Sequence, residues 1–420
     1  MDGKGAAREG PRGGKATDEN PPRPRGSSGE ADSIGLVSVL AAVALTVVGV
    51  VLHSFVGALP AVCLTTGLVM TAGAGLRCRT TRGRRVRTVV VGSFSSLHTL
   101  ECELLFAGIE RYVLVGRMSF GDSAADDSSV LGRLEDLRDV VVRHDISLVL
   151  MTREVSRGAV FDAMAGSCDD LPVQLWDIPG FYEDTFRCVP LAEINAAWFQ
   201  HILHPRYRPP SAAAKRAFDV AFAICVGLLT LPLLILVMAL IRRDGPVLFR
   251  QTRIGEAGRP FTIYKLRTMT SARDSEPRWS SAEDLRVTGL GRRLRRTHLD
   301  ELPQLWNILR GDMSVVGPRP EQPAFVSRLE REFPFYRRRH QLRPGLTGWA
   351  QARCGYAGSC DGTAWKLSHD LYYLKYRSHA IDFRILVETS RHIVFGSQYG
   401  EPRSVSFITP RAEHARVSGS

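Results

Sequence analysis

The sequence predicts a membrane-associated α/β chain with three folded parts: an N-terminal transmembrane helical hairpin, a Rossmann-like parallel α/β module, and a C-terminal α+β domain with a re-entrant membrane helix. The 420 residues leave room for two domains besides tails and anchors. Residues 34–76 contain no charged side chain, and residues 217–241 contain only one, Asp219. Between these apolar stretches, strand-like and helix-like segments alternate, which is typical of a parallel sheet with crossover helices.

The composition excludes several classes of protein. A formal net charge of +12 together with long apolar stretches does not fit a coiled coil, a wholly disordered chain or an ordinary one-domain soluble enzyme. The eight cysteines show no CxxC and no Cys/His zinc spacing. We therefore exclude a disulfide scaffold and expect reduced cysteines that act as small apolar side chains.

The N-terminal part of the chain predicts a tail followed by a membrane anchor. Residues 1–33 hold six basic and six acidic residues and few large apolar ones, which is typical of a disordered tail. The apolar stretch that follows is long enough for two membrane helices, expected at 34–52 and 58–76, because the residues between His53 and Pro60 form a natural break. One long tilted helix is the alternative.

Charge beside the anchor predicts its orientation. Six arginines follow it between Arg77 and Arg87. Because basic flanks stay in the cytoplasm, a hairpin would leave both the tail and the following domain there.

Residues 86–208 predict a Rossmann-like accessory module. Its first turn, Val91 to Ser96, holds only Gly92 of the three glycines of a dinucleotide fingerprint, and no acidic residue follows the next strand. We therefore expect a structural or regulatory module, with cofactor binding as the alternative. The expected strands are 88–91, 112–115, 147–151 and 172–176, and the expected helices are 97–108 and 134–144.

A second domain is expected over 215–396, beginning with the apolar helix 217–241. Basic residues flank both ends of this helix, and Pro232 near its middle removes a backbone hydrogen bond. A helix that breaks there, dips into the membrane and returns would leave both basic ends on one face. A third complete span is the alternative, and it would place the following residues outside the cell. Residues 247–251 and 260–265 then predict a β-hairpin.

Two adjacent carboxylates, Asp300 and Glu301, form the candidate catalytic pair. The sequence predicts a helix over 301–310 that ends at Gly311, with Asp300 at its N-cap. Free N–H groups at a helix N-terminus favour a nearby phosphate and an ionised carboxylate. Adjacent carboxylates diverge by about 100° on a helix, so one can attack phosphorus while the other holds Mg²⁺ or handles a proton. A plain helix cap is the alternative for Asp300.

Basic residues around this pair predict a pocket for a diphosphate. Two rigid turns, Gly317–Pro320 and Arg343–Gly345, each fix one arginine, and arginine forks match phosphate oxygens. The run Arg337–Arg339 is expected to be a solvated basic face or to contact anionic lipid head groups beside the aromatic residues of 333–336. The expected phosphate contacts are Lys265, Arg267, Arg295, Arg319 and Arg343.

The stretch from Lys215 to Ile393 resembles the bacterial sugar transferase family, the monotopic phosphoglycosyl transferases that start exopolysaccharide and O-antigen synthesis. The upstream anchor and sheet module resemble the longer members, the polyprenyl glycosylphosphotransferases. The motifs that carry the resemblance are Lys215-Arg216-Ala217-Phe218-Asp219, Phe249-Arg250-Gln251, Lys265-Leu266-Arg267-Thr268-Met269, Leu299-Asp300-Glu301-Leu302-Pro303-Gln304, Gly317-Pro318-Arg319-Pro320, Arg343-Pro344-Gly345, Asp370-Leu371-Tyr372-Tyr373 and Asp382.

The resemblance implies an α+β phosphoglycosyl transferase domain with a re-entrant helix, at the cytoplasmic face of the bacterial inner membrane. Such an enzyme transfers a sugar-1-phosphate from a nucleotide-diphosphate sugar, here expected to be a UDP-hexose, to undecaprenyl phosphate. It implies Asp300 as a nucleophile that forms an aspartyl-phosphosugar intermediate and Glu301 as its acid/base partner, with Mg²⁺ held by both. Lys265, Arg295 and Arg319 would contact substrate, and Asp370 would be a supporting polar residue.

Two positions depart from the family pattern. The family commonly has serine before the helix-breaking proline, and this chain has Leu231. The family also has serine two residues before the nucleophile, where this chain has His298. A histidine there would touch the phosphate or tune Asp300, and a surface substitution without a role is the alternative.

Two other classes of function remain as alternatives. A non-catalytic membrane scaffold or regulator of polysaccharide synthesis would need a decayed Asp300–Glu301 constellation, and nothing obvious is missing. A nucleotide-sugar oxidoreductase or epimerase would act through the first module, and the single glycine of its first turn argues against that. The sequence leaves open the identity of the hexose and a homo-oligomeric state. It predicts a lipid bilayer and no nucleic acid as partner, and it predicts a loose tail at 397–420.

Overall fold

The structure is a computed structural model of the chain. The predicted tails and the predicted transmembrane hairpin lie outside the residues that it describes, so those predictions stay predictions. The described residues are 85–119, 128–152, 155, 159–202, 211–243, 245–270, 286–333, 335–354 and 360–395.

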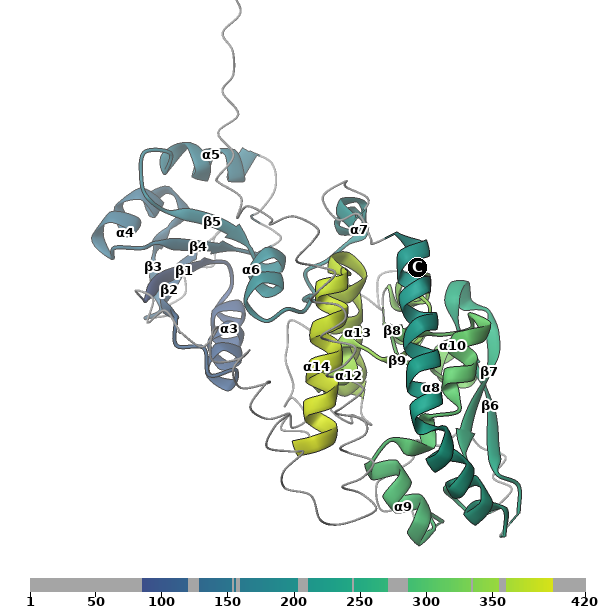
Figure 1. Cartoon of the computed structure of the whole chain (residues 1–420). Helices are drawn as coiled ribbons and strands as arrows, with labels where there is room; N and C mark the ends of the chain where they lie inside the picture. The colour runs from purple at the N-terminus through teal and green to yellow at the C-terminus, as the bar shows by residue number, and fades with distance from the viewer. Residues whose placement is uncertain are drawn as a thin grey trace, which may run out of the picture. The chain divides into compact units, whose positions relative to one another are not determined.

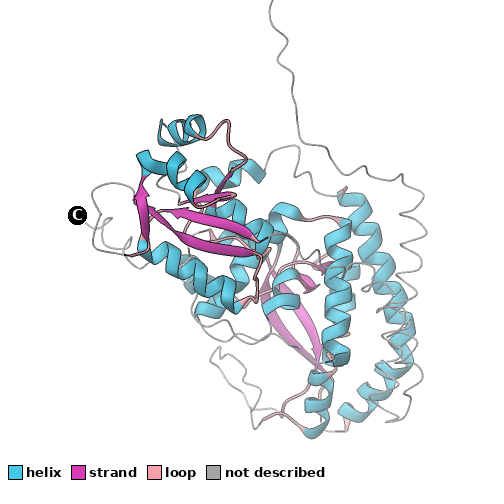
Figure 2. Cartoon of the chain, turned by 90° about the vertical axis from the view of Figure 1, so that its left-hand side faces the viewer, coloured by secondary structure: helices cyan, strands magenta, loops and turns pink. Residues whose placement is uncertain are grey.

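The first described part is a parallel α/β module. Its five strands run in the order β3-β2-β1-β4-β5 and pair in parallel throughout, and helices lie on both sides of this sheet (Figures 1 and 2). The strands are β1 (Val86–Val91), β2 (Tyr112–Ser119), β3 (Val130–Arg133), β4 (Leu148–Met151) and β5 (Gln174–Asp177), and the helices are α3 (Phe94–Phe106), α4 (Leu137–Arg143), α5 (Ala159–Ser167) and α6 (Ile178–Thr185). The predicted alternation of strands and helices is therefore confirmed.

Apolar residues of the central strands explain this sheet. Val89 and Val91 of β1 and Val149 and Met151 of β4 are buried in one core cluster, and such β-branched or apolar runs suit strands that are covered on both faces. Strand β3 was not predicted, because its four residues lie at the edge of the sheet and are only partly buried.

A short helix, α7 (Ala196–Ile202), precedes the long apolar helix α8 (Ala212–Arg242). By length and composition, α8 is the one helix among the described residues that could cross a membrane. It continues through Pro232 without ending, and its axis bends partway along (Figure 1). Two residues earlier, the Thr230 hydroxyl donates a 2.7 Å hydrogen bond to the Val226 carbonyl. The predicted bend is thus present, whereas the predicted break is not, because the helical backbone continues on both sides of the proline.

The remaining elements form the second part. The predicted hairpin is confirmed as β6 (Leu248–Ile254) and β7 (Pro260–Leu266), which pair antiparallel. Side chains of the second half of α8 pack with β7, with the helix Gly289–Arg296 and with the 3₁₀ turn Leu299–Glu301 in one core cluster. The other elements are the 3₁₀ turns η3 (Glu256–Gly258), η4 (Leu299–Glu301) and η5 (Tyr336–Gln341), the strands β8 (Ser314–Val316) and β9 (Gly345–Thr347), and the helices α9 (Gly289–Arg296), α10 (Gln304–Arg310), α11 (Pro323–Glu332), α12 (Trp349–Cys354), α13 (Cys360–Tyr376) and α14 (His379–Phe395).

The helix predicted at 301–310 begins later than expected. The Glu301 N–H donates to the His298 carbonyl and the Leu302 N–H to the Leu299 carbonyl, which makes this stretch a 3₁₀ turn. The α-helix starts only at Gln304. Asp300 is therefore a residue of the turn and not the N-cap of the helix. The predicted end is confirmed, since Gly311 adopts a left-handed conformation with φ 92°.

Candidate active site

Asp300 and Glu301 lie buried in η4, where their side chains are held between neighbouring elements. The two residues are 7% and 8% exposed. Leu299, the residue before them, packs against Val237 and Ile241 of α8. The apolar residue of the turn thus fixes the two carboxylates beside the second half of the apolar helix.

Glu301 is the carboxylate that basic side chains neutralise. Its Oε1 accepts hydrogen bonds from Lys265 Nζ at 2.6 Å and Arg319 Nη2 at 3.2 Å. Burial alone would raise the pKa of Glu301, but the charges of Lys265 and Arg319 outweigh burial and hold this pKa well below its ordinary value. Glu301 is therefore ionised at neutral pH.

Asp300 has the opposite shift. Burial, and then the negative charge of Glu301, raise the pKa of Asp300 above its ordinary value, although Lys265, His298 and Arg295 act against that rise. This result corrects the expectation that a helix N-terminus would favour the ionised form, because Asp300 is not at the helix N-terminus. Two adjacent carboxylates with pKa values displaced in opposite directions are suited to two different tasks.

The basic residues reach Glu301 from two separate elements. Lys265 is the penultimate residue of β7. Arg319 belongs to the turn that begins at Gly317, and this turn is pinned to the neighbouring one because Gly317 N–H donates to Thr347 O and Gly345 N–H to Pro318 O, both at 2.9 Å. A Cβ at Gly317 would overlap the Arg343 carbonyl. Glycine there allows the two predicted arginine turns to lie back to back.

A buried arginine that sequence reasoning missed supports this turn. Arg339 Nη2 donates to the Arg319 carbonyl at 2.9 Å and lies 2.8 Å from Asp370 Oδ2. Arg339 and Asp370 are 5% and 2% exposed. Among the described residues, Asp370, predicted as a supporting polar residue, is linked to the Arg319 turn through Arg339.

The prediction for the run Arg337–Arg339 needs correction. Arg337 and Arg338 are exposed, whereas Arg339 and Tyr336 are buried and hydrogen-bonded to each other at 2.7 Å. These two residues share a face because side chains three apart in a 3₁₀ helix lie in line. The three-residue spacing of Tyr336 and Arg339 can be read from the sequence, but it predicts that both side chains are buried only once the 3₁₀ conformation is known.

The other predicted phosphate contacts are distributed unevenly. Arg295 Nε donates to Thr268 Oγ1 at 2.9 Å, and Arg295 is close enough to lower the pKa of Asp300. Arg267 Nη2 donates to the Ile241 carbonyl at 3.2 Å, and Arg343 Nε donates to Glu256 Oε2 at 3.1 Å. The described contacts thus unite Lys265, Arg295 and Arg319 with the two carboxylates and place Arg267 and Arg343 elsewhere.

His298 lies beside both carboxylates. Its backbone is left-handed, with φ 55°, at the start of η4. Its positive form acts to lower the pKa values of Asp300 and Glu301. The His298 side chain is exposed beside the two carboxylates, and its predicted role in tuning Asp300 stays a prediction.

The donor set limits which cation the site could hold. Among the described residues, no group of three or more His, Cys, Asp or Glu side chains is arranged to bind a metal. Two adjacent carboxylates remain, one of them already paired with two basic residues. This fits Mg²⁺, which commonly takes one or two carboxylates and completes its shell with water and substrate phosphate.

Comparison with known proteins places these residues in a family. Residues 210–396 match the family model described as bacterial sugar transferase. The chain is 43% identical over 191 residues to a UDP-N-acetylgalactosamine-undecaprenyl-phosphate N-acetylgalactosaminephosphotransferase from Aeromonas hydrophila, a match that covers 45% of each protein. It is 44% identical over 182 residues to a UDP-glucose:undecaprenyl-phosphate glucose-1-phosphate transferase from Caulobacter vibrioides, and this match covers 42% of the chain and 67% of the relative. The chain belongs to the bacterial sugar transferase family.

This family membership confirms the resemblance predicted from the motifs. A third relative, an undecaprenyl-phosphate glucose phosphotransferase from Komagataeibacter xylinus, is 33% identical over 338 residues, which is 75% of this chain and 60% of that protein. The similarity thus extends beyond the sugar transferase part. The matches span about half of the Aeromonas relative and three fifths of the Komagataeibacter relative.

Proposed function

We propose that this bacterial sugar transferase moves a sugar-1-phosphate from a UDP-hexose to undecaprenyl phosphate and so initiates the synthesis of a surface polysaccharide. The observation that carries the proposal is the Asp300–Glu301 pair. Glu301 is neutralised by Lys265 and Arg319, so Asp300, which forms no ion pair with another described residue, is left as the second carboxylate of this basic site. The names of the relatives from Aeromonas hydrophila and Caulobacter vibrioides describe reactions of this type.

The proposed chemistry has two displacements at one phosphorus atom. An Asp300 carboxylate oxygen attacks the β-phosphorus of the UDP-sugar, and the bond from this phosphorus to the bridging oxygen breaks, which releases UMP. A phosphate oxygen of undecaprenyl phosphate then attacks the same phosphorus and breaks its bond to Asp300. The products are a lipid diphosphate sugar and free Asp300, and neither step requires an oxidant or a reductant.

Basic residues would stabilise the charge that moves in these steps. Arg295, Arg319 and Lys265 approach the pair from three elements, and fixed cations that face a transferring phosphoryl group lower the barrier without having to reorganise. Mg²⁺, when bound, would neutralise charge on the diphosphate, with Asp300 and Glu301 as its protein ligands. Residues of this chain supply the nucleophile and the positioning.

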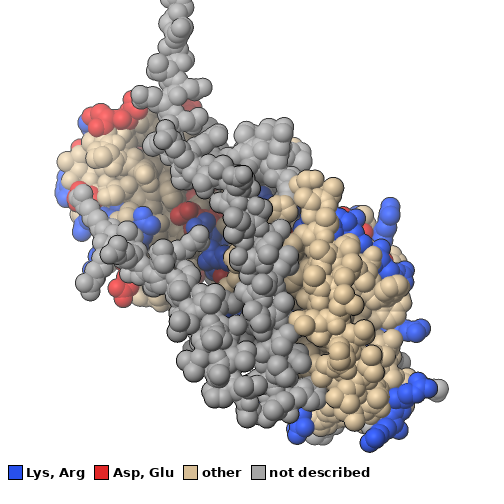
Figure 3. Space-filling view, viewed as in Figure 1, with Lys and Arg blue, Asp and Glu red and all other residues tan. Residues whose placement is uncertain are grey.

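We place the catalytic domain at a membrane, moored by α8. Several large apolar side chains of this helix are exposed, and Leu228 is 67% and Ile235 59% exposed. Figure 3 shows a face along α8 that is free of charged residues, with Lys and Arg side chains gathered at its lower end. Exposed arginines at that end belong to the C-terminus of α8 and to α9. They are Arg242, Arg243, Arg292, Arg293 and Arg296.

An apolar face fringed by arginines is typical of a protein that sits in a lipid interface. We infer that α8 lies in the cytoplasmic face of the inner membrane and that its bend near Pro232 keeps both basic ends of the helix on that face, so that UDP-sugar and lipid phosphate meet on one side. Accessibility labelling of a single cysteine introduced at exposed Arg296 tests this. Reaction with a membrane-impermeant reagent only in inverted vesicles supports the inference, and reaction in intact cells contradicts it.

The activity is tested with purified full-length protein in detergent. A panel of UDP-sugars with undecaprenyl phosphate should release UMP with one hexose and yield a polyprenyl diphosphate sugar. UMP release without any lipid, limited to one equivalent per protein, would support the covalent intermediate. Absence of UMP release with every sugar in the panel would overturn the proposal and favour a non-catalytic scaffold.

A further inference from the structure

A broad hollow opens at the far end of the β6–β7 hairpin from the carboxylate pair. Its volume is about 1110 Å³, and it is lined by the hairpin tip, by Gly311 and Asp312 after α10, and by residues of η5. At about 3.3 Å per residue, the strand from Pro260 to Lys265 spans about 16 Å. A diphosphate that reacts with Asp300 would not reach this hollow with the same phosphates.

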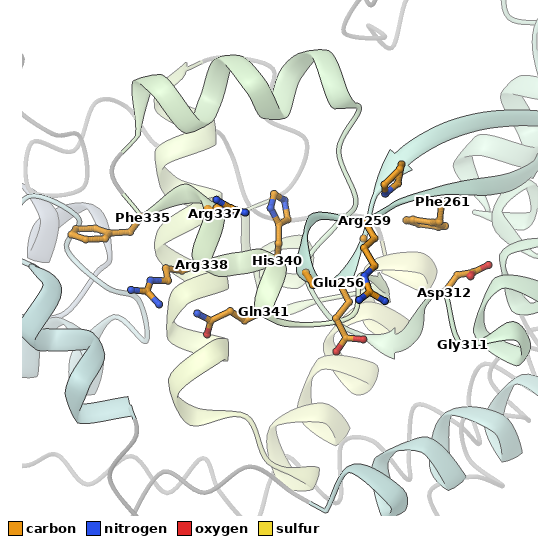
Figure 4. Close-up of a pocket in the computed structure, with 13 residues that line it drawn as sticks. Glu256, Arg259, Phe261, Gly311, Asp312, Phe335, Arg337, Arg338, His340 and Gln341 are labelled. Atoms are coloured by element: carbon orange, nitrogen blue, oxygen red, sulfur yellow. The ribbon is translucent and has the colours of Figure 1, made fainter.

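Arginines from two elements line the hollow. Arg259 comes from the hairpin tip and Arg337 and Arg338 from η5, and all three are exposed. Figure 4 shows Arg259 on the hairpin side of the hollow and Arg337 and Arg338 on the η5 side, with Gln341 between them. Positive charge therefore enters the hollow from both sides.

The carboxylates of the lining are engaged by other arginines. Glu256 Oε2 accepts from Arg343 Nε at 3.1 Å, and Asp312 Oδ2 lies 3.4 Å from Arg310 Nε. Neither Arg343 nor Arg310 is among the lining residues. The two negative charges are thus balanced from outside the lining. The Arg338 guanidinium lies 4.9 Å from the centroid of the Phe199 ring, a contact that leaves its positive charge in place, so the charge of the lining arginines is left over for a ligand.

A buried histidine adds a neutral polar group to the wall. His340 is 8% exposed. Its Nδ1 lies 3.9 Å from Glu330 Oε1 and makes no hydrogen bond with any described residue. Burial, together with the charges of Arg339 and Arg337, lowers the pKa of His340 to about 4. His340 is therefore neutral at pH 7 and does not repel the arginines beside it.

The two faces of η5 connect the hollow with the active site. Arg337 and Arg338 line the hollow. Arg339, the next residue, points the other way into the protein and donates a hydrogen bond to the Arg319 carbonyl. Arg319 in turn binds Glu301. A ligand that orders η5 would therefore act on the turn that positions Arg319.

We infer that this hollow is a second anion site, which binds a phosphate-bearing ligand through Arg259, Arg337 and Arg338. The geometry of a guanidinium group matches that of phosphate oxygens. Three guanidinium groups from two elements therefore suit a ligand that offers several phosphate oxygens. Such a ligand is either a soluble phosphate compound, such as a nucleotide, or an anionic lipid head group. The chemistry of recognition is the same for both.

Arginine labelling distinguishes the two sources. The full-length protein is treated with phenylglyoxal alone, with inorganic pyrophosphate, or with vesicles of phosphatidylglycerol or of phosphatidylcholine, and modified arginines are located by mass spectrometry. Protection of Arg259, Arg337 and Arg338 by pyrophosphate assigns a soluble ligand, and protection by phosphatidylglycerol vesicles alone assigns a lipid. Arg328 and Arg331, exposed on α11 outside the hollow, should stay reactive. Equal reactivity of the hollow arginines under all conditions overturns the inference.

Substitutions provide an independent measurement. An Arg319→Ala background weakens the donor site, so pyrophosphate titration in that background reports on the hollow. There, Arg259→Ala with Arg337→Ala should weaken binding about tenfold or more, and the paired lysine substitutions should retain part of it. Arg328→Ala with Arg331→Ala is the matched control and should leave binding unchanged. Equal affinity of the alanine pair and the control would contradict the inference.

Discussion

Lys265 and Glu301 form an ion pair of 2.6 Å that joins the end of β7 to the turn that carries both carboxylates. Their side chains are 18% and 11% exposed, so the pair is largely shielded from water. Arg319 reaches the same oxygen at 3.2 Å. Because two cations share one carboxylate oxygen, the position of Glu301 depends on both, and Lys265 also lowers the pKa of Asp300.

Removing the Lys265 side chain should lower the stability of the protein as well as the rate of its reaction. Lys265→Met leaves the buried Glu301 with only Arg319, and a buried charge that loses a hydrogen-bonded partner costs about 1–3 kcal/mol. We expect a lower Tm for the purified protein in detergent. Arg328→Met, a change at an exposed position on α11, is the control. An unchanged Tm for Lys265→Met would mean that the ion pair contributes nothing to folding.

Replacement of the proposed nucleophile should abolish both half-reactions. Asp300→Asn keeps the size of the side chain but removes the attacking charge, and turnover should fall by about a thousandfold or more. The measurement is UMP release together with mass spectrometry of the intact protein after incubation with donor. Asp169→Asn, at an exposed position of the sheet module, should behave like the wild type. A phosphosugar adduct on the Asp300→Asn protein would transfer the role to another residue.

The rate of intermediate formation should decline in mild acid. Asp300 must be ionised to attack, and burial and Glu301 raise its pKa above the ordinary 3.8. The rate of intermediate formation is therefore at its maximum above this raised pKa and decreases as the pH falls through it. Glu301→Gln removes the neighbouring negative charge and frees Lys265 and Arg319, so the pKa of Asp300 should fall and the acid limb should move to lower pH. The acid limbs of the wild type and of Glu301→Gln are measured from the UMP burst by rapid quench at a series of pH values. An acid limb of Glu301→Gln at higher pH than that of the wild type would contradict the assignment.

Stability should also depend on Glu301 in acid. Its pKa in the folded protein lies well below the ordinary 4.5, so its contribution to the free energy of unfolding is complete above about pH 4.5 and is lost as the pH falls further. Wild-type Tm should therefore decrease more steeply below pH 4.5 than the Tm of Glu301→Gln. Parallel Tm profiles of the two proteins between pH 3 and pH 7 would show that Glu301 is not stabilised by its ion pairs.

The sequence predicted what depends on local pattern. Alternating apolar runs predicted the parallel sheet, the apolar stretch with Pro232 predicted α8 and its bend, and the motifs that hold Lys265, Glu301 and Arg319 predicted three residues that the structure brings into contact. These features are set by periodicity, by proline chemistry and by motifs in a fixed order.

Features that depend on tertiary packing were missed. Nothing local distinguishes Arg339 from Arg337 and Arg338, and only the contact with Asp370 and the Arg319 carbonyl determines which arginine is buried. Arg267 and Arg343 were grouped with the phosphate contacts because of their motifs, but the direction of a side chain at a turn is fixed by what packs behind it. The 3₁₀ turn at Asp300 was likewise unpredictable, because helix signals do not separate a 3₁₀ turn from the first turn of an α-helix.

Arg339 should affect catalysis by positioning Arg319 and not by contact with substrate. It binds the Arg319 carbonyl and Asp370 with nearly its whole guanidinium buried. Arg339→Lys keeps the charge but replaces the planar fork by one ammonium group, so it cannot hold Tyr336, Asp370 and the carbonyl in the same geometry. We expect kcat to fall about tenfold or more with a small change in KM, because Arg319 would be misplaced mainly for the transition state.

A double-mutant cycle separates this role from a general loss of stability. If Arg339 acts through Arg319, then Arg339→Lys should cost much less activity in an Arg319→Ala background than in the wild type, while its effect on Tm should be the same in both. Asp370→Asn should follow Arg339→Lys in both measurements, since it removes the charge that holds the guanidinium. Equal losses of activity in the two backgrounds would show that Arg339 stabilises the fold without positioning Arg319.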